Sequence, residues 1–251
     1  MGAHLLRHLV LKEEKVLALK RPASNIDYTR SVFQTYSNDP HHLFDRIEWV
    51  EGDVLDYEGL LDYFSRVDQV YHAAALVSFD PSYRKAMLDT NIRGTSNVVN
   101  AALEKGVEKL AYVSSVSALD PAKENRMLDE LQFGNDPTRN SAYGESKFQS
   151  ELEVWRGVEE GLHVVVVNPS IILGPMVPLD GPGGMFQALK KGIGFYPGGM
   201  TGFVDVRDVC RSLVELMKRG IYNERFIVSQ GNHSYRYIFQ TIAGAFASRL
   251  P

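Results

Sequence analysis

Short runs of apolar and β-branched residues alternate along this chain with longer segments of helical periodicity. The apolar runs that predict strands are residues 16–19, 47–50, 69–72, 110–113 and 163–167. The last run holds four consecutive valines, a pattern typical of a strand that is covered on both faces. Strands that alternate with helices indicate βαβ units, and the sequence therefore predicts an α/β fold with a doubly wound parallel sheet.

Helical spacing between these runs predicts helices at residues 56–64, 82–105, 141–160 and 234–247. Residues 3–12 also form an amphipathic pattern, and no strand precedes them. A parallel sheet that starts with a helix is unusual, so we expect the chain to begin after the first strand of its fold. After Pro169, glycine and proline punctuate a loop-rich stretch, and loops such as residues 178–184 are expected to shape a ligand pocket.

Composition narrows the class of protein. The chain has 251 residues and a formal net charge of -4, which gives no reason to expect nucleic acid or a membrane surface as partner. No apolar run approaches the roughly 20 residues of a spanning helix. The single cysteine, Cys210, lies in a helical apolar pattern and is expected to be buried. We therefore expect a soluble, cytoplasmic protein. No metal is expected, because His41 and His42 lack further ligands at useful spacing.

The first chemical signal is Tyr143, which lies four residues before Lys147 in a predicted helix. That spacing places the phenol and the ammonium on one face of the helix. A nearby positive charge favours the phenolate and would bring the tyrosine pKa from about 10 toward the neutral range, as proton transfer requires. The same spacing also occurs by chance on exposed helices.

The second signal is the segment 114–117, which follows the predicted strand 110–113 and contains Ser114, Ser115 and Ser117. Ligands bind at the carboxyl ends of parallel strands, and a serine hydroxyl there can hold a carbonyl oxygen. The alternative is a polar turn that leaves the sheet.

Together these motifs resemble the extended branch of the short-chain dehydrogenase/reductase family. Further segments agree with the family in order and spacing over nearly the whole chain, namely residues 51–54, 70–75, 91–97, 168–175 and 203–209. The resemblance implies a Rossmann-type NAD(P)-binding domain over residues 1–170. Residues 171–251 would then form a mixed region with later sheet elements and part of a substrate lobe.

The resemblance also implies roles for single residues. Tyr143 would be the general acid/base, Lys147 would lower its pKa and bind the nicotinamide ribose, and Ser115 would orient the substrate oxygen, with Ser117 as a weaker alternative. Asn91 would either support a proton-relay water or hold a neighbouring strand. The other implied cofactor-binding residues are Gly2, Arg21, Asp53, Val54, Ala73, Ala74, Ala75, Asn168, Pro169 and Ile171.

The cofactor expectation depends on two short segments. The family binds the pyrophosphate with a glycine-rich loop, of which Gly2 resembles only the last glycine, so we expect weak or no cofactor binding by this chain alone. The C-terminal lobe is also expected to be incomplete. After the first predicted strand come Lys20 and Arg21. An acidic residue there would favour NAD, whereas an arginine favours the 2′-phosphate, so NADP is expected over NAD.

The expected reaction is hydride transfer that interconverts a secondary alcohol with a ketone or aldehyde. Val116 and Ser117 stand where sugar dehydratases of the family usually carry acidic residues. Residues 168–175 resemble dihydroflavonol and cinnamoyl-CoA reductases, and residues 72–97 resemble 3β-hydroxysteroid dehydrogenases. A nucleotide-sugar epimerase and a non-catalytic NAD(P)-binding protein or inactive fragment are the alternatives. A small-molecule substrate and a homodimer formed through the helices predicted at residues 82–105 and 141–160 are the expected partners.

Overall fold

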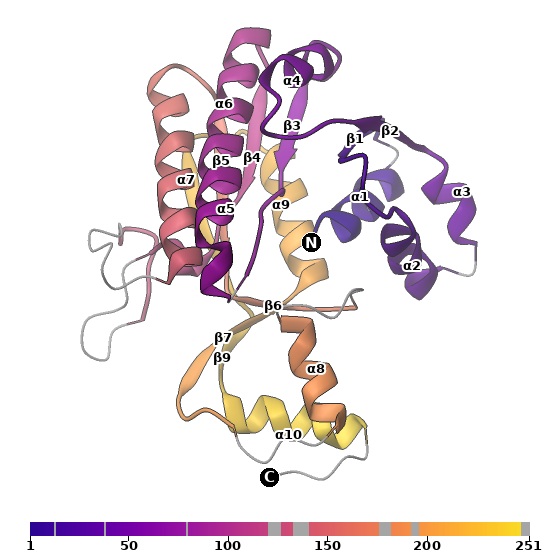
Figure 1. Ribbon diagram of the computed structural model, residues 1–251, viewed down its shortest axis with the longest axis vertical. Helices are drawn as coiled ribbons and strands as arrows, with labels where there is room; N and C mark the ends of the chain where they lie inside the picture. Colours follow the sequence, from indigo (N-terminus) through magenta and orange to yellow (C-terminus); the bar gives the residue numbers. More distant parts are fainter. Residues whose placement is uncertain are drawn as a thin grey trace.

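The structure is a computed structural model that describes residues 1–12, 14–37, 39–78, 80–119, 127–132, 141–175, 182–191 and 196–246. The described residues form an α/β fold with three sheets, ordered β1-β2, β3-β4-β5-β8 and β6-β7-β9 (Figure 1). All pairs in the first two sheets are parallel, which confirms the predicted doubly wound class. Within the described residues, β1 and β3 belong to separate sheets.

The strands are β1 (Val16–Lys20), β2 (Ile47–Glu51), β3 (Gln69–His72), β4 (Lys109–Val113), β5 (Val164–Pro169), β6 (Ile171–Leu173), β7 (Met200–Asp205), β8 (Glu224–Val228) and β9 (Gly231–Ser234). The α-helices are α1 (Gly2–Leu11), α2 (Asp27–Tyr36), α3 (Pro40–Phe44), α4 (Tyr57–Phe64), α5 (Arg84–Leu88), α6 (Gly94–Lys105), α7 (Ala142–Glu159), α8 (Pro182–Lys191), α9 (Val206–Lys218) and α10 (Tyr235–Ala245). Three short helical turns complete the set: η1 (Pro81–Tyr83), η2 (Asp89–Arg93) and η3 (Val116–Ala118).

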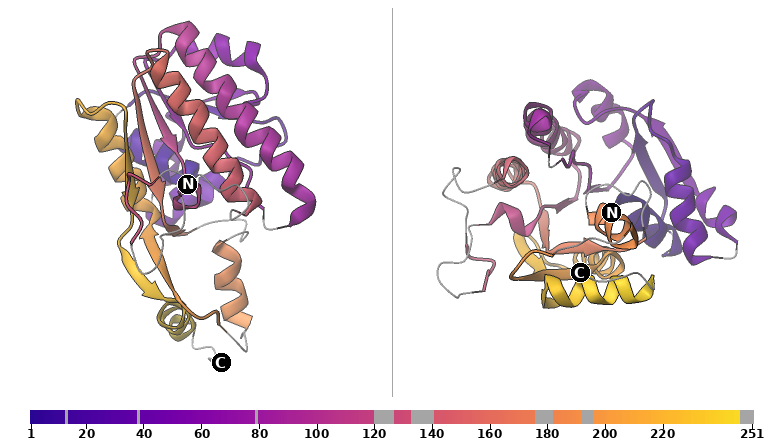
Figure 2. Two further views of the ribbon diagram at one scale, coloured as in Figure 1. Left: turned by 90° about the vertical axis from the view of Figure 1, so that its left-hand side faces the viewer. Right: turned by 60° about the horizontal axis from the view of Figure 1, so that its bottom comes forward.

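The central sheet is covered on both faces because its middle strands, β4 and β5, are mostly apolar and are buried along their whole length. One face of β4 and β5 packs against α4, α6 and α7 in a cluster that includes Tyr112 and Val166. The opposite face packs against α1 and α9, and this cluster includes Val113 and Val165. Figure 2 (left) shows α6 and α7 on one side of these strands and α9 on the other. Cys210 is buried in the second cluster, as predicted, and burial raises its pKa to about 12.

The chain after residue 171 contributes to the central sheet and to a separate lobe. Strand β8 pairs with β5 at the edge of the central sheet, so the chain returns to that sheet after residue 171. The sheet β6-β7-β9 packs with α8 and α10 around Leu189, Phe203 and Phe239, and forms a lobe beside the central sheet (Figure 1). The loop predicted at residues 178–184 lies, up to residue 181, outside the described residues.

Side-chain caps fix the boundaries of the helices that matter for the site. The carboxylate of Asp56 accepts a hydrogen bond from the Gly59 amide at the start of α4, at the predicted position. The helix predicted at residues 82–105 is a continuous path through η1, α5, η2 and α6, in which η2 is a π-turn that contains Asn91. No helix among the described residues is long and apolar enough to cross a membrane.

Candidate active site

The helix that carries Tyr143 and Lys147 starts next to the carboxyl end of β4. Ser141 caps α7, because its hydroxyl accepts a hydrogen bond from the Gly144 amide at 3.1 Å. Tyr143 therefore lies in the first turn and Lys147 one turn later. The Lys147 side chain faces inward and the residue is only 4% exposed, whereas Tyr143 is half-buried.

Ser115 lies just beyond β4, with its backbone extended. The Ser117 amide donates to its hydroxyl oxygen at 3.1 Å, so the Ser115 side chain caps the turn η3. The phenol of Tyr143 lies close enough to the Ser115 hydroxyl for this serine to lower the pKa of the phenol. Two of the three side chains expected to act together therefore meet, although they are far apart in sequence.

The ammonium of Lys147 reaches the same strand end by another contact. Its Nζ donates to the carbonyl oxygen of Val113 at 2.8 Å and lies 5.0 Å from the centroid of the Tyr112 ring. Burial lowers the pKa of Lys147 to about 8, and the carboxylate of Glu151 opposes that shift.

The acidity of Tyr143 differs from the expectation. Burial raises the pKa of its phenol above the usual value, and the hydrogen bond with Ser115 lowers it only in part. Burial is therefore the dominant effect on the phenol, while the Nζ of Lys147 donates to the Val113 carbonyl of β4. Helical spacing placed the phenol and the ammonium on one face, but it could not show how deeply the phenol is buried.

Asn91 is buried, and both ends of its side-chain amide form hydrogen bonds. Its amide exchanges two hydrogen bonds with the backbone of Leu76, at 2.7 and 3.0 Å, and its Nδ2 also donates to Ser146 Oγ at 2.9 Å. The Ser146 hydroxyl in turn donates to the Tyr143 carbonyl at 2.8 Å. These contacts tie the loop after β3 to the helix that carries Tyr143, which is the structural one of the two roles considered for Asn91.

The residues expected to bind cofactor follow the carboxyl ends of parallel strands. Lys20 at the end of β1 pairs with Glu51 at the end of β2, with 2.5 Å between Nζ and Oε1. Arg21, the next residue, is exposed. Asp53 turns the chain after β2 by accepting from the Leu55 amide at 3.0 Å.

Comparison with known proteins identifies the family. The sequence profile described as "Male sterility protein" matches residues 1–234. The chain belongs to this family of extended short-chain dehydrogenases/reductases. It is 28% identical to a protein of Synechocystis sp. named "Putative dihydroflavonol 4-reductase", over 97% of this chain and 70% of that protein.

Solved structures agree on the fold. The crystal structure of gox2253 superposes with a TM-score of 0.86 at 27% identity, over 99% of this chain and 72% of that one. The UDP-glucose 4-epimerase of Thermus thermophilus, solved as a complex with NAD, gives 0.78 at 21% identity, over 100% and 82% of the two chains. The chain is thus an NAD(P)-dependent enzyme of the short-chain dehydrogenase/reductase type.

The strand ends of this family member suit a dinucleotide. Beyond β3, Ala74 and Ala75 are exposed and carry only a methyl group, so a flat ligand can approach the backbone there. The first turn of α1 contacts the segment after β6, because His4 Nε2 is 2.7 Å from the carbonyl oxygen of Pro175. Gly2 has open space around its Cα, with no atom within 4 Å of an added Cβ. These residues fit the cofactor that the family uses.

Three further cofactor candidates lie at the end of β5 and the start of β6. Asn168 Nδ2 donates to the Ser115 carbonyl at 3.0 Å, which places the end of β5 beside the candidate serine. Asn168 Oδ1 is buried and has no hydrogen-bond partner among the described residues, so an acceptor is left for a ligand donor. Pro169 is the last residue of β5, and Ile171 starts β6.

The sequence did not reveal the buried polar cluster behind Ser115 and Lys147, which consists of Ser114, Glu151, Asn168 and Arg225. The available signal was the spacing of Tyr143, Lys147 and Glu151, which repeats every four residues along one helix face. Arg225 lies 74 residues after Glu151, and no local pattern connects them.

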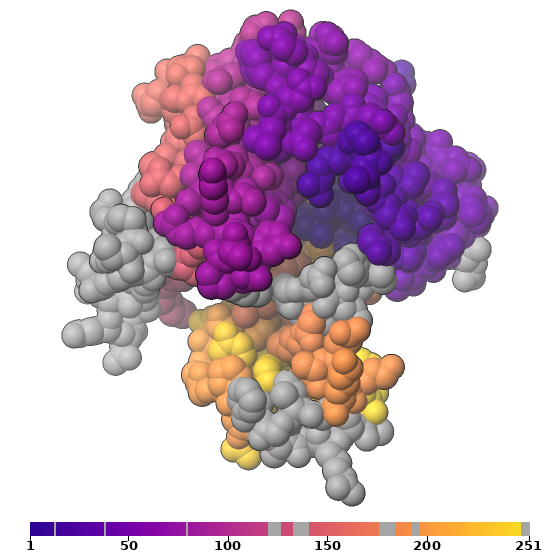
Figure 3. All heavy atoms as spheres, viewed as in Figure 1, coloured from indigo at the N-terminus to yellow at the C-terminus, as the bar shows by residue number. Residues whose placement is uncertain are grey.

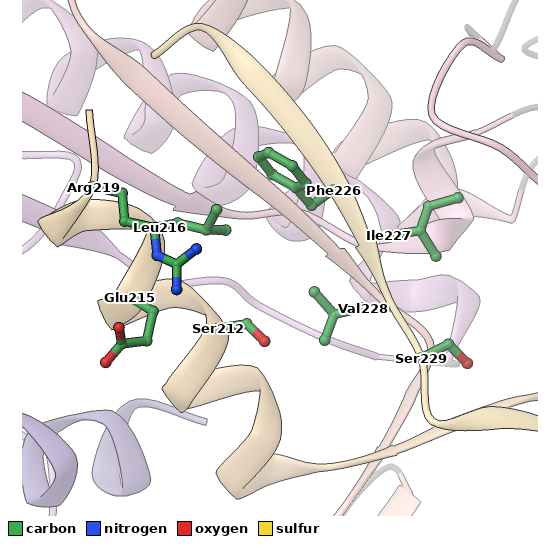
Figure 4. A pocket seen from close by; sticks show the side chains of 8 residues that line it. All are labelled: Ser212, Glu215, Leu216, Arg219, Phe226, Ile227, Val228 and Ser229. Atoms are coloured by element: carbon green, nitrogen blue, oxygen red, sulfur yellow. The ribbon is translucent and has the colours of Figure 1, made fainter. Parts of the chain in front are cut away.

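A separate depression lies between α9 and β8. Its lining residues are Ser212, Glu215, Leu216, Arg219, Phe226, Ile227, Val228 and Ser229 (Figure 4). None of the catalytic candidates lines it. By contrast, Figure 3 shows the surface hollowed where the indigo N-terminal residues, the magenta segment around α5 and the orange lobe meet.

Proposed function

We propose that this protein catalyses hydride transfer that interconverts a secondary alcohol and a ketone or aldehyde. The interaction of the Tyr143 phenol with Ser115 supports this proposal most directly, because an acid and an oxygen-binding hydroxyl are then close together beyond the carboxyl end of β4. A protein that only binds a dinucleotide needs neither group. NAD(P)H, when bound, supplies the hydride.

The residues of the chain account for the proton and the oxygen. The Ser115 hydroxyl donates to the substrate carbonyl oxygen and stabilises the negative charge that grows on it during reduction. Tyr143 then transfers its phenolic proton to that oxygen, and in the oxidative direction the phenolate takes it back. The raised pKa of Tyr143 keeps the phenol protonated at neutral pH and so favours the reductive direction.

Lys147 has two tasks in this proposal. Its ammonium stabilises the phenolate that Tyr143 becomes after proton transfer, and its remaining N–H bonds are available to the nicotinamide ribose. The contact with the Val113 carbonyl uses one of the three donors and orients the other two. Burial next to β4 also keeps water away from the amine.

We also propose that NADP is preferred over NAD. Lys20 is bound to Glu51, so Arg21 is the exposed cation at the end of β1 and is available to a 2′-phosphate. An Arg21→Ala variant is expected to raise KM for NADPH about tenfold or more, the equivalent of a lost charge-assisted contact, and to leave KM for NADH unchanged. Equal effects on the two cofactors would contradict the preference.

We further propose a homodimer formed by the outer faces of α6 and α7. Leu152 is a large apolar side chain left 39% exposed on α7, and Glu153 and Arg156 border it. A Leu152→Glu variant is expected to shift the mass measured by light scattering from dimer to monomer. A monomeric wild-type protein would contradict this proposal.

The test of the proposed reaction is turnover of full-length protein with and without the phenol. Wild type is assayed by NADPH oxidation against a panel of ketones and aldehydes, and nucleotide sugars are incubated with NAD and analysed for the epimeric sugar. A Tyr143→Phe variant is then assayed with the best substrate. We expect kcat to fall by at least about 100-fold, the range of general acid–base catalysis, with NADPH affinity unchanged. Unchanged turnover rejects the assignment, and activity confined to nucleotide sugars favours an epimerase.

A further inference from the structure

Glu151 is a buried carboxylate on the inner face of α7, one turn after Lys147. Its side chain is 3% exposed. Both oxygens are occupied: Oε2 accepts from Ser114 Oγ at 2.6 Å and from Asn168 Nδ2 at 2.9 Å, and Oε1 accepts from Arg225 Nη1 at 2.9 Å. The carboxylate therefore joins one helix to three strands, β4, β5 and β8.

The first consequence concerns the position of Ser115. Ser114, its neighbour in the chain, is held by Glu151, and Asn168 uses the same Nδ2 to bind both Glu151 and the Ser115 carbonyl. These bonds fix the carboxyl ends of β4 and β5 against α7. Since Tyr143 is on α7, the distance between the phenol and the serine hydroxyl depends on this carboxylate.

The second consequence concerns the charge of Lys147. The titratable groups around its ammonium are Tyr143 and Glu151 on α7, Tyr112 on β4, and His72 on β3, which lies against the Tyr112 ring. Burial lowers the pKa of His72 to about 3 and raises the pKa of Tyr112, so both are neutral at pH 7. Glu151 is the acidic residue among these groups, and it faces Arg225 on its other side.

We propose that Glu151 is a positioning residue of the active site, which holds the strand end that carries Ser115 and keeps Lys147 in its ammonium form. Replacing a buried ion pair by apolar residues is often neutral for stability, so the pair with Arg225 is better explained by the geometry and charge it fixes. The catalytic consequence rests on the proposed function, whereas the charge of Lys147 is measurable without turnover.

The test is a titration of Lys147 by NMR in full-length protein labelled with ¹³Cε-lysine. The Lys147 resonance is identified by its loss in a Lys147→Arg variant. In Glu151→Gln we expect the titration midpoint of Lys147 to fall by about one pH unit, as for the loss of an adjacent opposite charge. The matched control is Glu153→Gln on the same helix, whose carboxylate binds Arg156 and Ser96 near the surface, and it should leave the midpoint unchanged.

A second readout separates this role from a merely structural one. The alkaline limb of the pH profile of kcat should move to lower pH in Glu151→Gln, and Glu151→Asp, which keeps the charge, should restore it. If Glu151→Gln does not fold, the double variant Glu151→Gln with Arg225→Met removes both partners of the buried ion pair and takes its place in the same titration. An unchanged Lys147 midpoint overturns the proposal, and it does so whether or not Tyr143→Phe supports the proposed reaction.

Discussion

Gly94 starts α6 against Val54, which lies in the segment after β2, and a substitution at Gly94 tests the packing between them. A Cβ added to Gly94 would lie 2.6 Å from Val54 Cγ2 and 3.2 Å from Val54 Cβ. Val54 cannot easily retreat, because Asn97 Nδ2, one turn along α6, donates to its carbonyl at 2.9 Å. Gly94→Ala therefore forces the Val54 side chain out of its position.

The expected change in the free energy of unfolding is the sum of two opposed contributions. Overpacking of this kind costs about 1–3 kcal/mol, and replacing a helical glycine with alanine returns about 1 kcal/mol. We expect a net loss of about 1 kcal/mol in the free energy of unfolding, which lowers Tm by about 2–4 °C for a chain of this size. In a Val54→Ala background the Cγ2 contact is gone, and the loss should disappear.

The assay is thermal unfolding of wild type, both single variants and the double variant. The expected coupling energy between the two sites is about 1–2 kcal/mol. Gly244→Ala in α10 is the control, since an added Cβ meets no atom within 4 Å, and it should raise stability by up to about 1 kcal/mol. An equal loss for Gly94→Ala in both backgrounds would refute the steric argument.

Two further perturbations test the buried polar groups of the central sheet. Burial lowers the pKa of His72 to about 3, so the folded state keeps this ring neutral, whereas the unfolded chain takes up a proton below about pH 6.5. The free energy of unfolding should therefore fall as the pH falls between these two values, by up to about 1.4 kcal/mol per pH unit. Between pH 7 and pH 5, the unfolding free energy measured with urea should fall less for His72→Leu than for wild type. The control His41→Ala, at an exposed histidine, should behave as wild type. Equal losses in all three proteins would disprove the assignment. The buried ammonium of Lys109 donates to the carbonyls of Leu216 and Arg219 at the end of α9, at 2.7 and 3.0 Å. Lys109→Met should therefore lower the unfolding free energy by about 2 kcal/mol. A loss under about 0.5 kcal/mol would argue against this role of Lys109.

Local chemistry made the central sheet and its helices predictable. The four valines of β5 are typical of a strand with both faces covered, and the helix predicted from residue 141 is capped there by the Ser141 hydroxyl in the structure. The pair Tyr143 and Lys147 was visible because helical spacing is fixed by geometry. Ser115 was visible because a polar residue after a buried strand marks the ligand edge of a parallel sheet.

Long-range pairing was not predictable in the same way. Strand β8 joins β5 although the two are far apart in sequence, and it carries charged residues, Glu224 and Arg225, at its start. Nothing nearby in sequence shows that Arg225 is satisfied by Glu151 inside the protein. The direction of Lys147 toward the Val113 carbonyl likewise depends on how α7 packs against β4, which sequence periodicity does not specify.

The most direct measurement of the central claim is the fate of the transferred hydrogen in single turnover. Full-length wild type and Tyr143→Phe, each saturated with NADPH deuterated at both C4 positions, are mixed with the best carbonyl substrate, and deuterium in the product is measured by mass spectrometry. Hydride transfer assisted by the Tyr143 phenol predicts one deuterium on the carbinol carbon with wild type and at least about 100-fold slower incorporation with the variant. Equal rates of incorporation in the two proteins, or product without deuterium, would contradict it.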